Sequence, residues 1–336
     1  MLGQIVKLDR GFPLVRLEDG SFVRCKHAVD LVKHGDSRGV IGDWVELLME
    51  DGLDNDLDNA QILRILPRKQ VLIRKDPADR TQPQILAANF DLIIVTQPLA
   101  ELNVSRLERE LVLAYETGAQ VAVVLTKADL AESEGQIQQV RDSVADMVGD
   151  IPVLVVSADD RESVAQVSQL IGDRMAVLLG RSGVGKSSLI NVLVGQDVQE
   201  TTPVREGDGK GRHTTVSREM VFLPQGGCVI DMPGIRGVGL WDATDGINAA
   251  FADVVQLAQS CRFDDCRHEA EPGCAVREAV EDGSLSPRRL EAYKRLRDEN
   301  QANLDAREVA QRTKERRGHP RTRGQGSRGK RVRPRK

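Results

Sequence analysis

The sequence has no apolar run that approaches the roughly 18 residues needed to cross a membrane as a helix. Its first seven residues lack the pattern of a secretory signal peptide. These two absences argue against a membrane protein and against an exported one, so we expect the protein in the cytoplasm. Aromatic residues are also scarce, at 3% of the chain, which leaves few side chains for stacking on nucleic-acid bases.

Length and charge set further limits. A chain of 336 residues is too long for one ordinary hydrophobic core, so we expect two or three domains. Residues 312–336 carry 12 Lys and Arg residues against one acidic residue, whereas residues 1–311 carry 35 against 50. The basic end is predicted to be disordered until it meets phosphate, and it indicates a polyanionic partner. Composition alone also fits a solubility tail.

Residues 180–187 read GRSGVGKS and match the phosphate-binding pattern G-x-x-x-x-G-K-[ST] at every position. A strand-length apolar run precedes them and a stretch with helical spacing follows, which makes a chance Gly-rich turn a weak alternative. Lys186 is expected to reach the outer phosphates of a nucleotide, and the Ser187 hydroxyl to hold Mg²⁺. The predicted contacts are Gly180, Arg181, Ser182, Gly183, Val184, Gly185, Lys186, Ser187 and Ser188.

Residues 1–75 read as five short strands separated by turns. This spacing predicts a small closed barrel, and the OB-fold is the five-stranded barrel that often binds nucleic acid. An SH3-like or other small barrel without a ligand is the alternative, because Phe12, Phe22 and Trp44 suit a core equally well. Residues 76–88, with two prolines among polar residues, are the predicted linker.

From residue 89 the pattern changes to alternating strands and helices. Four stretches are continuous apolar runs, as expected for parallel strands that helices cover on both faces: residues 90–96, 121–125, 152–156 and 175–179. We therefore predict a P-loop α/β domain over residues 89–245, with its chemistry at the ends of these strands.

Two short motifs that follow these strands favour guanine as the base. An ionised Asp129 can accept both N–H donors of the guanine edge, because a carboxylate is an acceptor only. The stem of Lys127 is expected to lie over the base. Thr126 stands where GTPases usually carry Asn, and its shorter reach predicts a somewhat lower affinity for the base. The predicted base contacts are Thr126, Lys127, Ala128, Asp129, Ser157 and Ala158.

Two motifs after the P-loop indicate a switch that senses the γ-phosphate. Residues 211–215 (GRHTT) are typical of the mobile loop whose Thr completes the Mg²⁺ sphere, and Thr214 is favoured over Thr215. A D-x-x-G turn runs from Asp231, which would support Mg²⁺, to Gly234, whose N–H would sense the γ-phosphate.

The group that positions the attacking water is not obvious. Ras-like enzymes carry a Gln just after D-x-x-G, and this chain has Ile235 there, so slow basal hydrolysis is expected. His213, beside Thr214, is the candidate catalytic replacement. An RNA contact or simple loop packing is the alternative role for His213.

The order of the motifs is permuted, because the guanine motifs precede the P-loop, whereas a Ras-like chain places them after it. Domains tolerate such a circular permutation because their termini lie close together on the surface. Its consequence is that the γ-phosphate-sensing turn leads directly into the next segment.

That segment, residues 246–311, contains the cluster C-x4-C-x-H-x5-C. Four of the ten Cys and His residues of the chain lie within 14 positions, and they predict one structural, tetrahedral Zn²⁺ site: Cys261, Cys266, His268 and Cys274. Scattered core cysteines are the alternative, and this is the expectation for Cys25 and Cys228. Helical spacing over residues 287–311 predicts a mainly helical domain.

The permuted motif order, the GRHTT loop and the Cys/His cluster together resemble the bacterial small ribosomal subunit biogenesis GTPase family, RsgA or YjeQ. The likeness covers nearly the whole chain except residues 312–336. It implies a factor that binds GTP or GDP with Mg²⁺, binds the immature small subunit and its rRNA, and hydrolyses GTP on release. The departures are Thr126 and Val216, where a third Thr often stands.

Two functions from different classes follow. The first is a GTPase stimulated by the small subunit, which acts as a late assembly checkpoint. The second is an RNA-binding protein that holds GTP as a structural ligand with negligible turnover, and an ATP-dependent protein is a weaker third. In each case we expect a monomer without a membrane partner.

Overall fold

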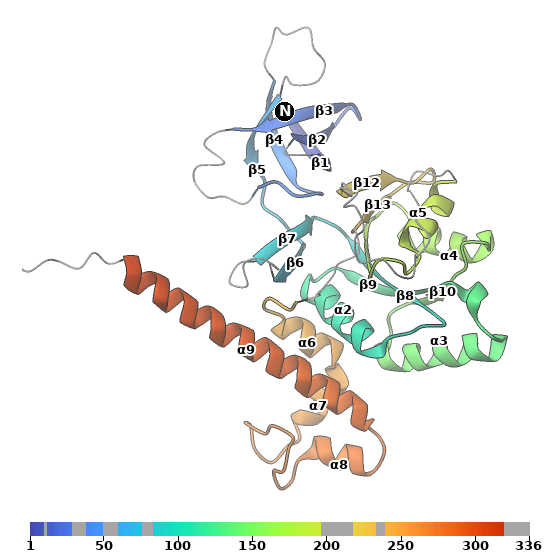
Figure 1. Ribbon diagram of the computed structural model, residues 1–336, viewed down its shortest axis with the longest axis vertical. Helices are drawn as coiled ribbons and strands as arrows, with labels where there is room; N and C mark the ends of the chain where they lie inside the picture. Colours follow the sequence, from blue (N-terminus) through green and yellow to red (C-terminus); the bar gives the residue numbers. More distant parts are fainter. Residues whose placement is uncertain are drawn as a thin grey trace, which may run out of the picture.

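The computed structural model describes residues 1–9, 12–28, 38–49, 60–75, 83–195, 218–232 and 239–318. Within these residues the chain forms an N-terminal barrel, a central sheet covered by helices, and a group of C-terminal helices that ends in one long helix (Figure 1). No helix in these ranges is both long and apolar enough to span a membrane.

The N-terminal strands close into the predicted five-stranded barrel. They are β1 (Leu2–Asp9), β2 (Phe12–Leu17), β3 (Phe22–His27), β4 (Trp44–Met49) and β5 (Ala60–Ile65). Their order is β1-β2-β3-β5-β4, and pairing between β1 and β4 closes the barrel, which is the expected OB-type fold. Alternate residues such as Ile5, Val15 and Ile62 fill the interior together with Cys25, which is buried as expected.

Part of the predicted linker is wrong. Residues 83–88 form strand β7 (Pro83–Ala88), which pairs antiparallel with β6 (Val71–Lys75). The apolar residues after Pro83 are the reason, because Leu86 and Ala87 are fully buried in the same core as the helices of the central domain. The remainder of that linker, residues 76–82, lies outside the described residues.

The central sheet has the order β10-β9-β8-β11-β13-β12. Its parallel strands are β8 (Leu92–Pro98), β9 (Gln120–Thr126), β10 (Val153–Val155), β11 (Met175–Leu179) and β13 (Cys228–Asp231), and β12 (Arg218–Phe222) is antiparallel. The strand that leads into the P-loop, β11, follows β8 to β10 in sequence but lies between β8 and β13 in space. This placement confirms the permuted P-loop domain.

Helices cover both faces of this sheet, as the apolar strands predict. They are α2 (Val104–Glu116), α3 (Glu134–Val148), α4 (Arg161–Ile171) and α5 (Lys186–Val194). Ile93 lies in the core with α2 and α3, whereas its neighbour Ile94 lies in the core with α4 and α5. The first three of these helices have polar N-caps at Asn103, Ser133 and Asp160, whose side chains accept from backbone N–H groups of the first turn in α2, α3 and α4.

The barrel and the central sheet are joined edge to edge, which the sequence did not predict. Strand β1 pairs antiparallel with β12, and the Lys7 ammonium lies 2.7 Å from the Glu219 carboxylate. The Arg16 guanidinium lies over the ring of Phe222 at 4.7 Å, and Phe22 meets the same ring edge to face. The strand that follows residues 196–217 is therefore anchored to the barrel.

The C-terminal region is helical, as predicted, with α6 (Thr244–Ala250), α7 (Ala252–Ala258), α8 (Ala275–Glu281) and α9 (Pro287–Gly318). Helix α9 continues seven residues into the segment predicted as a disordered tail. Residues 312–317 contain no Pro or Gly, so nothing stops the helix before Gly318. Residues 319–336 lie outside the described part of the chain.

Helix α9 also packs across α2, which ties the C-terminal helices to the central domain (Figure 1). Arg109 of α2 makes two bonds of 2.6 Å to the carboxylate of Glu299 in α9. The buried Glu108 lies 3.5 Å from the guanidinium of Arg295. Of these four residues only Glu108 is buried, so it is the one that most needs its partner, and both pairs connect α2 to α9.

Candidate nucleotide site

The P-loop leaves the end of β11 and enters α5, as the sequence predicts. Its glycines are required by geometry. A Cβ at Gly180 would lie 2.6 Å from the Thr96 carbonyl oxygen, and Gly185 has a φ of 101°, in the left-handed region. Only residues without a side chain allow this turn to bend tightly against the ends of β8 and β9.

Lys186 is held inside this turn. It is buried, and its ammonium donates to the carbonyl oxygens of Gly180 at 2.9 Å and Arg181 at 3.1 Å. Burial lowers the pKa of Lys186, while the nearby carboxylates of Asp231 and Glu110 raise it. A buried ammonium that is bound mainly by carbonyl oxygens is suited to an anion such as a nucleotide phosphate.

Asp231 ends β13 beside the P-loop strand, with which it pairs at Leu178. Burial raises the pKa of this carboxyl, and the Lys186 charge lowers it. One of its oxygens, Oδ1, is buried without a hydrogen-bond partner among the described residues. An orphaned carboxylate oxygen next to the P-loop fits the support of a hydrated Mg²⁺, which prefers oxygen ligands.

The guanine motifs meet at the same edge of the sheet. The Ser157 hydroxyl donates to Asp129 Oδ1 at 2.7 Å, and the Ala128 N–H donates to the Val156 carbonyl at 3.2 Å. These bonds join the loop after β9 to the turn after β10. Asp129 lies in a short 3₁₀ helix (Ala128–Leu130), and Lys127 precedes it with a left-handed φ of 57°.

Thr126, which was predicted to contact only the base, also contacts the P-loop. Its buried hydroxyl lies 2.5 Å from the Val184 carbonyl of the P-loop and 3.1 Å from the Gln97 carbonyl. The P-loop lies directly against this side chain, since even a Cβ built on Gly185 would be in ordinary contact with the Thr126 hydroxyl, 3.4 Å away. The hydroxyl therefore connects the guanine motif directly to the phosphate loop.

We expect Thr126→Val to lower GTP affinity roughly 5- to 100-fold, because it removes the hydroxyl donor nearest to the Val184 carbonyl of the P-loop. Thr117→Val is the matched control. Thr117 also donates its hydroxyl to a backbone carbonyl, that of Ala114, but it lies at the far end of α2. Nucleotide titration of both variants measures the difference, and equal affinities would remove Thr126 from the site.

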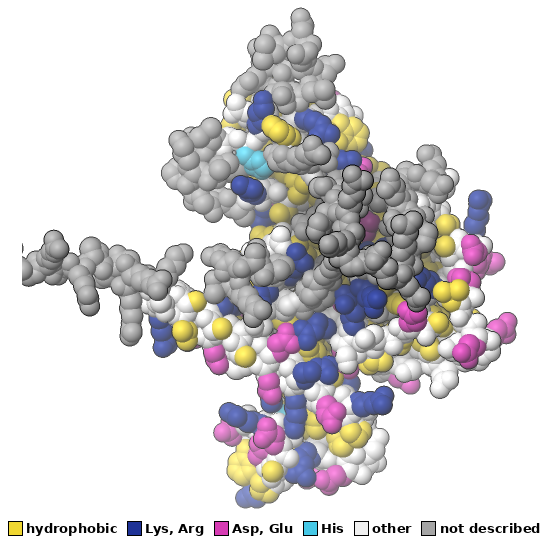
Figure 2. Space-filling model, in the orientation of Figure 1, with side chains coloured by type: hydrophobic (Ala, Val, Ile, Leu, Met, Phe, Trp, Pro, Cys, Tyr) yellow, Lys and Arg dark blue, Asp and Glu magenta, His cyan; other side chains and the backbone are white. Residues whose placement is uncertain are grey.

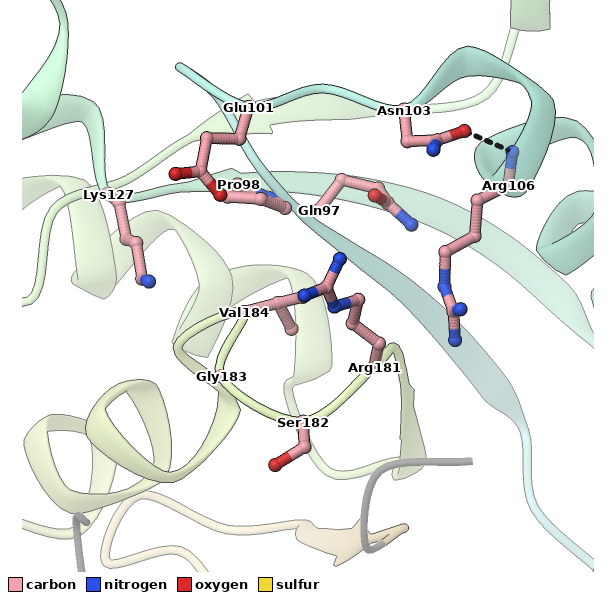
Figure 3. A pocket seen from close by; sticks show the side chains of 10 residues that line it. All are labelled: Gln97, Pro98, Glu101, Asn103, Arg106, Lys127, Arg181, Ser182, Gly183 and Val184. Atoms are coloured by element: carbon pink, nitrogen blue, oxygen red, sulfur yellow. Dashed lines mark hydrogen bonds between the residues drawn. The ribbon is translucent and has the colours of Figure 1, made fainter. Parts of the chain in front are cut away.

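Beside the P-loop the structure contains residues that sequence analysis missed. The Gln97 amide and the Arg106 guanidinium both bond to the fully buried carboxylate of Glu110, at 2.6 Å and 2.9 Å. Figure 3 shows Gln97 and Arg106 at the rim of a cavity of about 500 Å³ with the P-loop as its floor. A polar residue at the end of strand β8, and the i,i+4 spacing of Arg106 and Glu110, were the available signals.

The four predicted zinc ligands come together between α7 and α8. The ligand atoms of Cys261, Cys266, His268 and Cys274 all lie within 4.8 Å of one another. His268 Nδ1 lies 3.4 Å from the Cys274 sulfur and 3.7 Å from the Cys261 sulfur. A tetrahedral Zn²⁺ with ligands at about 2.0–2.3 Å places its ligand atoms roughly 3.3–3.8 Å apart, so the cluster fits this ion.

Several predicted site residues lie outside the described residues: His213, Thr214, Thr215, Gly234 and Ile235. The remaining predicted nucleotide contacts, on the P-loop and the two guanine motifs, are brought to one edge of the sheet.

Comparison with known proteins gives a consistent result. Residues 65–241 match the family model of the RsgA GTPase. The chain is 44% identical over 319 residues to a Small ribosomal subunit biogenesis GTPase RsgA of Streptomyces coelicolor, covering 93% of this chain and 85% of that protein. It is 42% identical over 263 residues to a protein of the same name from Methanosarcina acetivorans, covering 77% of this chain and 69% of that protein.

Solved structures agree on the fold. The crystal structure of YjeQ from Thermotoga maritima matches with a TM-score of 0.66 and 25% identity, over 89% of this chain and 98% of that one. The structure of YloQ, described as a circularly permuted GTPase, matches with a TM-score of 0.64 and 24% identity, over 90% of this chain and 95% of that one.

Proposed function

The chain belongs to the RsgA GTPase family and is a GTP hydrolase; from this premise we propose that it acts in the biogenesis of the small ribosomal subunit. In this proposal it binds the immature subunit and couples GTP hydrolysis to a late maturation checkpoint and to its own release. The observation that carries the proposal is the meeting of a guanine motif and a P-loop, joined by the Thr126 hydroxyl, on one edge of the sheet.

Each part of the site has a proposed role. Asp129 pairs with the guanine edge, the Lys127 stem covers the base, and the backbone at Ser157 and Ala158 donates to the guanine oxygen. The P-loop N–H groups and Lys186 bind the phosphates of GTP or GDP.

Ser187, Asp231 and Thr214 would hold or support Mg²⁺, which would neutralise phosphate charge. The Gly234 N–H senses the γ-phosphate.

The base assignment predicts the behaviour of Asp129→Asn. Because Asn keeps an oxygen that can accept from Ser157, the loop should hold its shape. The new amide donor meets a donor of guanine, so we expect GTP affinity to fall roughly 5- to 150-fold and preference to move toward xanthine nucleotide. Competition binding with both nucleotides checks this. Asp142→Asn, on the exposed face of α3, is the control, and an unchanged preference in Asp129→Asn would refute the assignment.

The partners follow from the same proposal. The barrel, the zinc-binding segment over residues 246–311 and the basic end contact rRNA of the small subunit, and the protein works as a monomer in the cytoplasm. Figure 2 shows several basic side chains close together near α2 on one face of the molecule, with acidic side chains interspersed along α9, and an RNA backbone would be attracted to the basic group. The Cys/His cluster holds one structural Zn²⁺.

Truncation after Gly318 tests the role of the basic end. It removes eight Lys and Arg residues and no acidic residue, while leaving α9 whole. Binding releases a counterion for each phosphate that a Lys or Arg neutralises, so a chain with fewer phosphate contacts releases fewer counterions. We therefore expect weaker subunit binding at low salt and a flatter dependence of log K on log salt. Binding measured between about 50 and 200 mM salt gives this slope. An unaltered slope would make the segment a solubility tail.

A turnover assay decides the function itself. GTP hydrolysis by the full chain is measured alone and with small ribosomal subunits, with large subunits as the control. Clear acceleration by small subunits alone supports the checkpoint function. The alternative, an RNA-binding protein with GTP as a structural ligand, predicts negligible turnover in all three samples, and family membership does not favour it.

A further inference from the structure

The aromatic side chains of the barrel lie on its outside. Phe12, Phe22 and Trp44 suit a core equally well in the sequence, and the structure places all three among the exposed residues, with Phe22 54% exposed. In the described part of the chain the barrel core consists of aliphatic side chains and Cys25. A single exposed ring is ordinary on a protein surface, so the neighbours of these rings decide whether they form a binding surface.

Phe22 belongs to the outer face of the β2–β3 hairpin. Successive side chains of a strand point to opposite sides. Cys25 is buried inside the barrel, so its neighbours Arg24 and Lys26 point outward, as does Phe22 two positions before Arg24. Arg16 of β2 lies directly opposite Phe22 in the antiparallel pair and therefore shares the same face.

The charge of this face suits a polyanion. Strands β2 (FPLVRL) and β3 (FVRCKH) contain three Arg and Lys residues and no acidic residue. The acidic residues of the hairpin, Glu18 and Asp19, lie in the turn between the strands, outside this face. Arg24 and Lys26 are two positions apart on one strand, which is a spacing of about 6.6–6.8 Å. Along β3 the face therefore presents one ring followed by two cations.

A second ring comes from the central domain. Phe222 ends β12, the strand that lies next to the barrel through its pairing with β1 (Figure 1). The ring centroids of Phe222 and Phe22 lie 6.4 Å apart, and the Arg16 guanidinium lies 4.7 Å above the Phe222 ring. These contacts hold Phe22 in place before any partner binds, so binding costs little of its side-chain freedom.

We propose that the outer face of β2 and β3, together with Phe222, binds unpaired nucleotides of the partner RNA. A base stacks on Phe22 beside Phe222, and the phosphates lie against Arg24 and Lys26. Rings and cations on one face suit single-stranded nucleic acid, because every base has a face that can stack and the backbone is negative throughout. The identity of that RNA rests on the proposed function. Because Phe222 belongs to the P-loop domain, one RNA segment contacts both domains.

The first test uses a fluorescently labelled single-stranded RNA of mixed sequence as the probe, titrated with the full chain. We expect Phe22→Leu to weaken binding about 5- to 150-fold, because one stacked base is lost. Phe22→Tyr keeps the ring and should stay near the wild-type affinity. Val309→Ala changes an exposed apolar residue of α9 and is the control. Wild-type affinity in Phe22→Leu, or an equal loss in Phe22→Tyr, would overturn the proposal.

The salt dependence tests the phosphate contacts separately from stacking. Lys26→Gln should lower the slope of log K against log salt by about one, whereas Phe22→Leu should weaken binding without changing the slope. Arg141→Gln, which removes an exposed arginine from α3, is expected to change neither affinity nor slope. An unaltered slope in Lys26→Gln would refute the placement of phosphates on this face.

Binding of small ribosomal subunits then separates RNA from protein as the partner. Phe22→Leu should weaken subunit binding together with binding of the single-stranded probe. If subunit binding falls while probe binding stays at the wild-type value, the face meets a ribosomal protein and the proposal is overturned. The proposed function is judged by other data, the turnover of the wild type with subunits. A chain that binds the probe through Phe22 without any stimulation by subunits would keep the stacking face and lose the checkpoint function.

Discussion

Replacing Cys266 with alanine is expected to abolish stoichiometric zinc and to loosen the segment between α7 and α8. Residues 259–274 contain only turns and bends, so no helix or strand holds the four ligands together. His268 also has a left-handed φ of 62°, which a non-glycine residue adopts only under tertiary constraint. In small zinc units the metal contributes about 10–16 kcal/mol of apparent binding energy, and this becomes folding energy.

The control for this prediction is another buried thiol. Cys25 lies in the barrel core, far from the cluster, so Cys25→Ala should keep one zinc per chain. GTP affinity should survive in Cys266→Ala, because α5, which follows the P-loop, packs in the core on the other face of the sheet from the core that contains Cys274. Metal analysis together with limited proteolysis checks both effects. Full zinc in Cys266→Ala would contradict the ligand set.

Local motifs with their own chemistry were predictable from the sequence. The P-loop pattern needs a strand before it and a helix after it, and β11 and α5 occupy those places. The Cys/His cluster needs only four ligands on one short segment, which can fold around the ion without help from distant residues. In both cases a contiguous stretch of chain contains nearly all of the geometry.

Contacts between distant residues were not predictable in the same way. Residues 83–88 were assigned to a linker because the stretch before them is polar and contains two prolines. They form strand β7, whose antiparallel partner β6 lies just before that stretch in the chain. The pairing of β12 with β1 was missed because the two strands lie more than 200 residues apart in the chain. The Gln97–Glu110–Arg106 network is closer in sequence, but it depends on how α2 packs back against the end of β8, which the sequence pattern does not specify.

Thr126 shows how a side chain can be judged wrongly without its surroundings. The Thr side chain is shorter than that of Asn, and its length alone predicted a lower affinity for the guanine base. The structure brings the P-loop to the hydroxyl instead, so that the Val184 carbonyl oxygen lies 2.5 Å from the Thr126 hydroxyl oxygen. What that geometry does to GTP affinity stays a prediction, and the Thr126→Val titration tests it.

The second large effect is expected from His213→Ala, which should abolish the acceleration of GTP hydrolysis by small subunits. The residue after D-x-x-G is Ile235, whose side chain can neither orient nor deprotonate water, so another group must do so. His213 stands next to Thr214, the predicted Mg²⁺ ligand of the γ-phosphate-sensing loop, and its imidazole can accept a proton near neutral pH. General base catalysis typically contributes about 10²- to 10⁴-fold in rate, so stimulated turnover should fall by a factor in this range.

The design separates catalysis from anchoring. GTP affinity and subunit affinity of His213→Ala should stay near the wild-type values, and turnover should be measured with subunits at saturation. His213→Gln adds a second comparison, because an amide can orient water, as the Gln of Ras-like enzymes does, but cannot replace a titrating imidazole. Partial recovery in this variant would indicate orientation of water, and no recovery would indicate proton transfer. If His213→Ala binds subunits poorly yet turns over fully once saturated, His213 anchors RNA, and the water must be positioned by a group that the ribosome supplies.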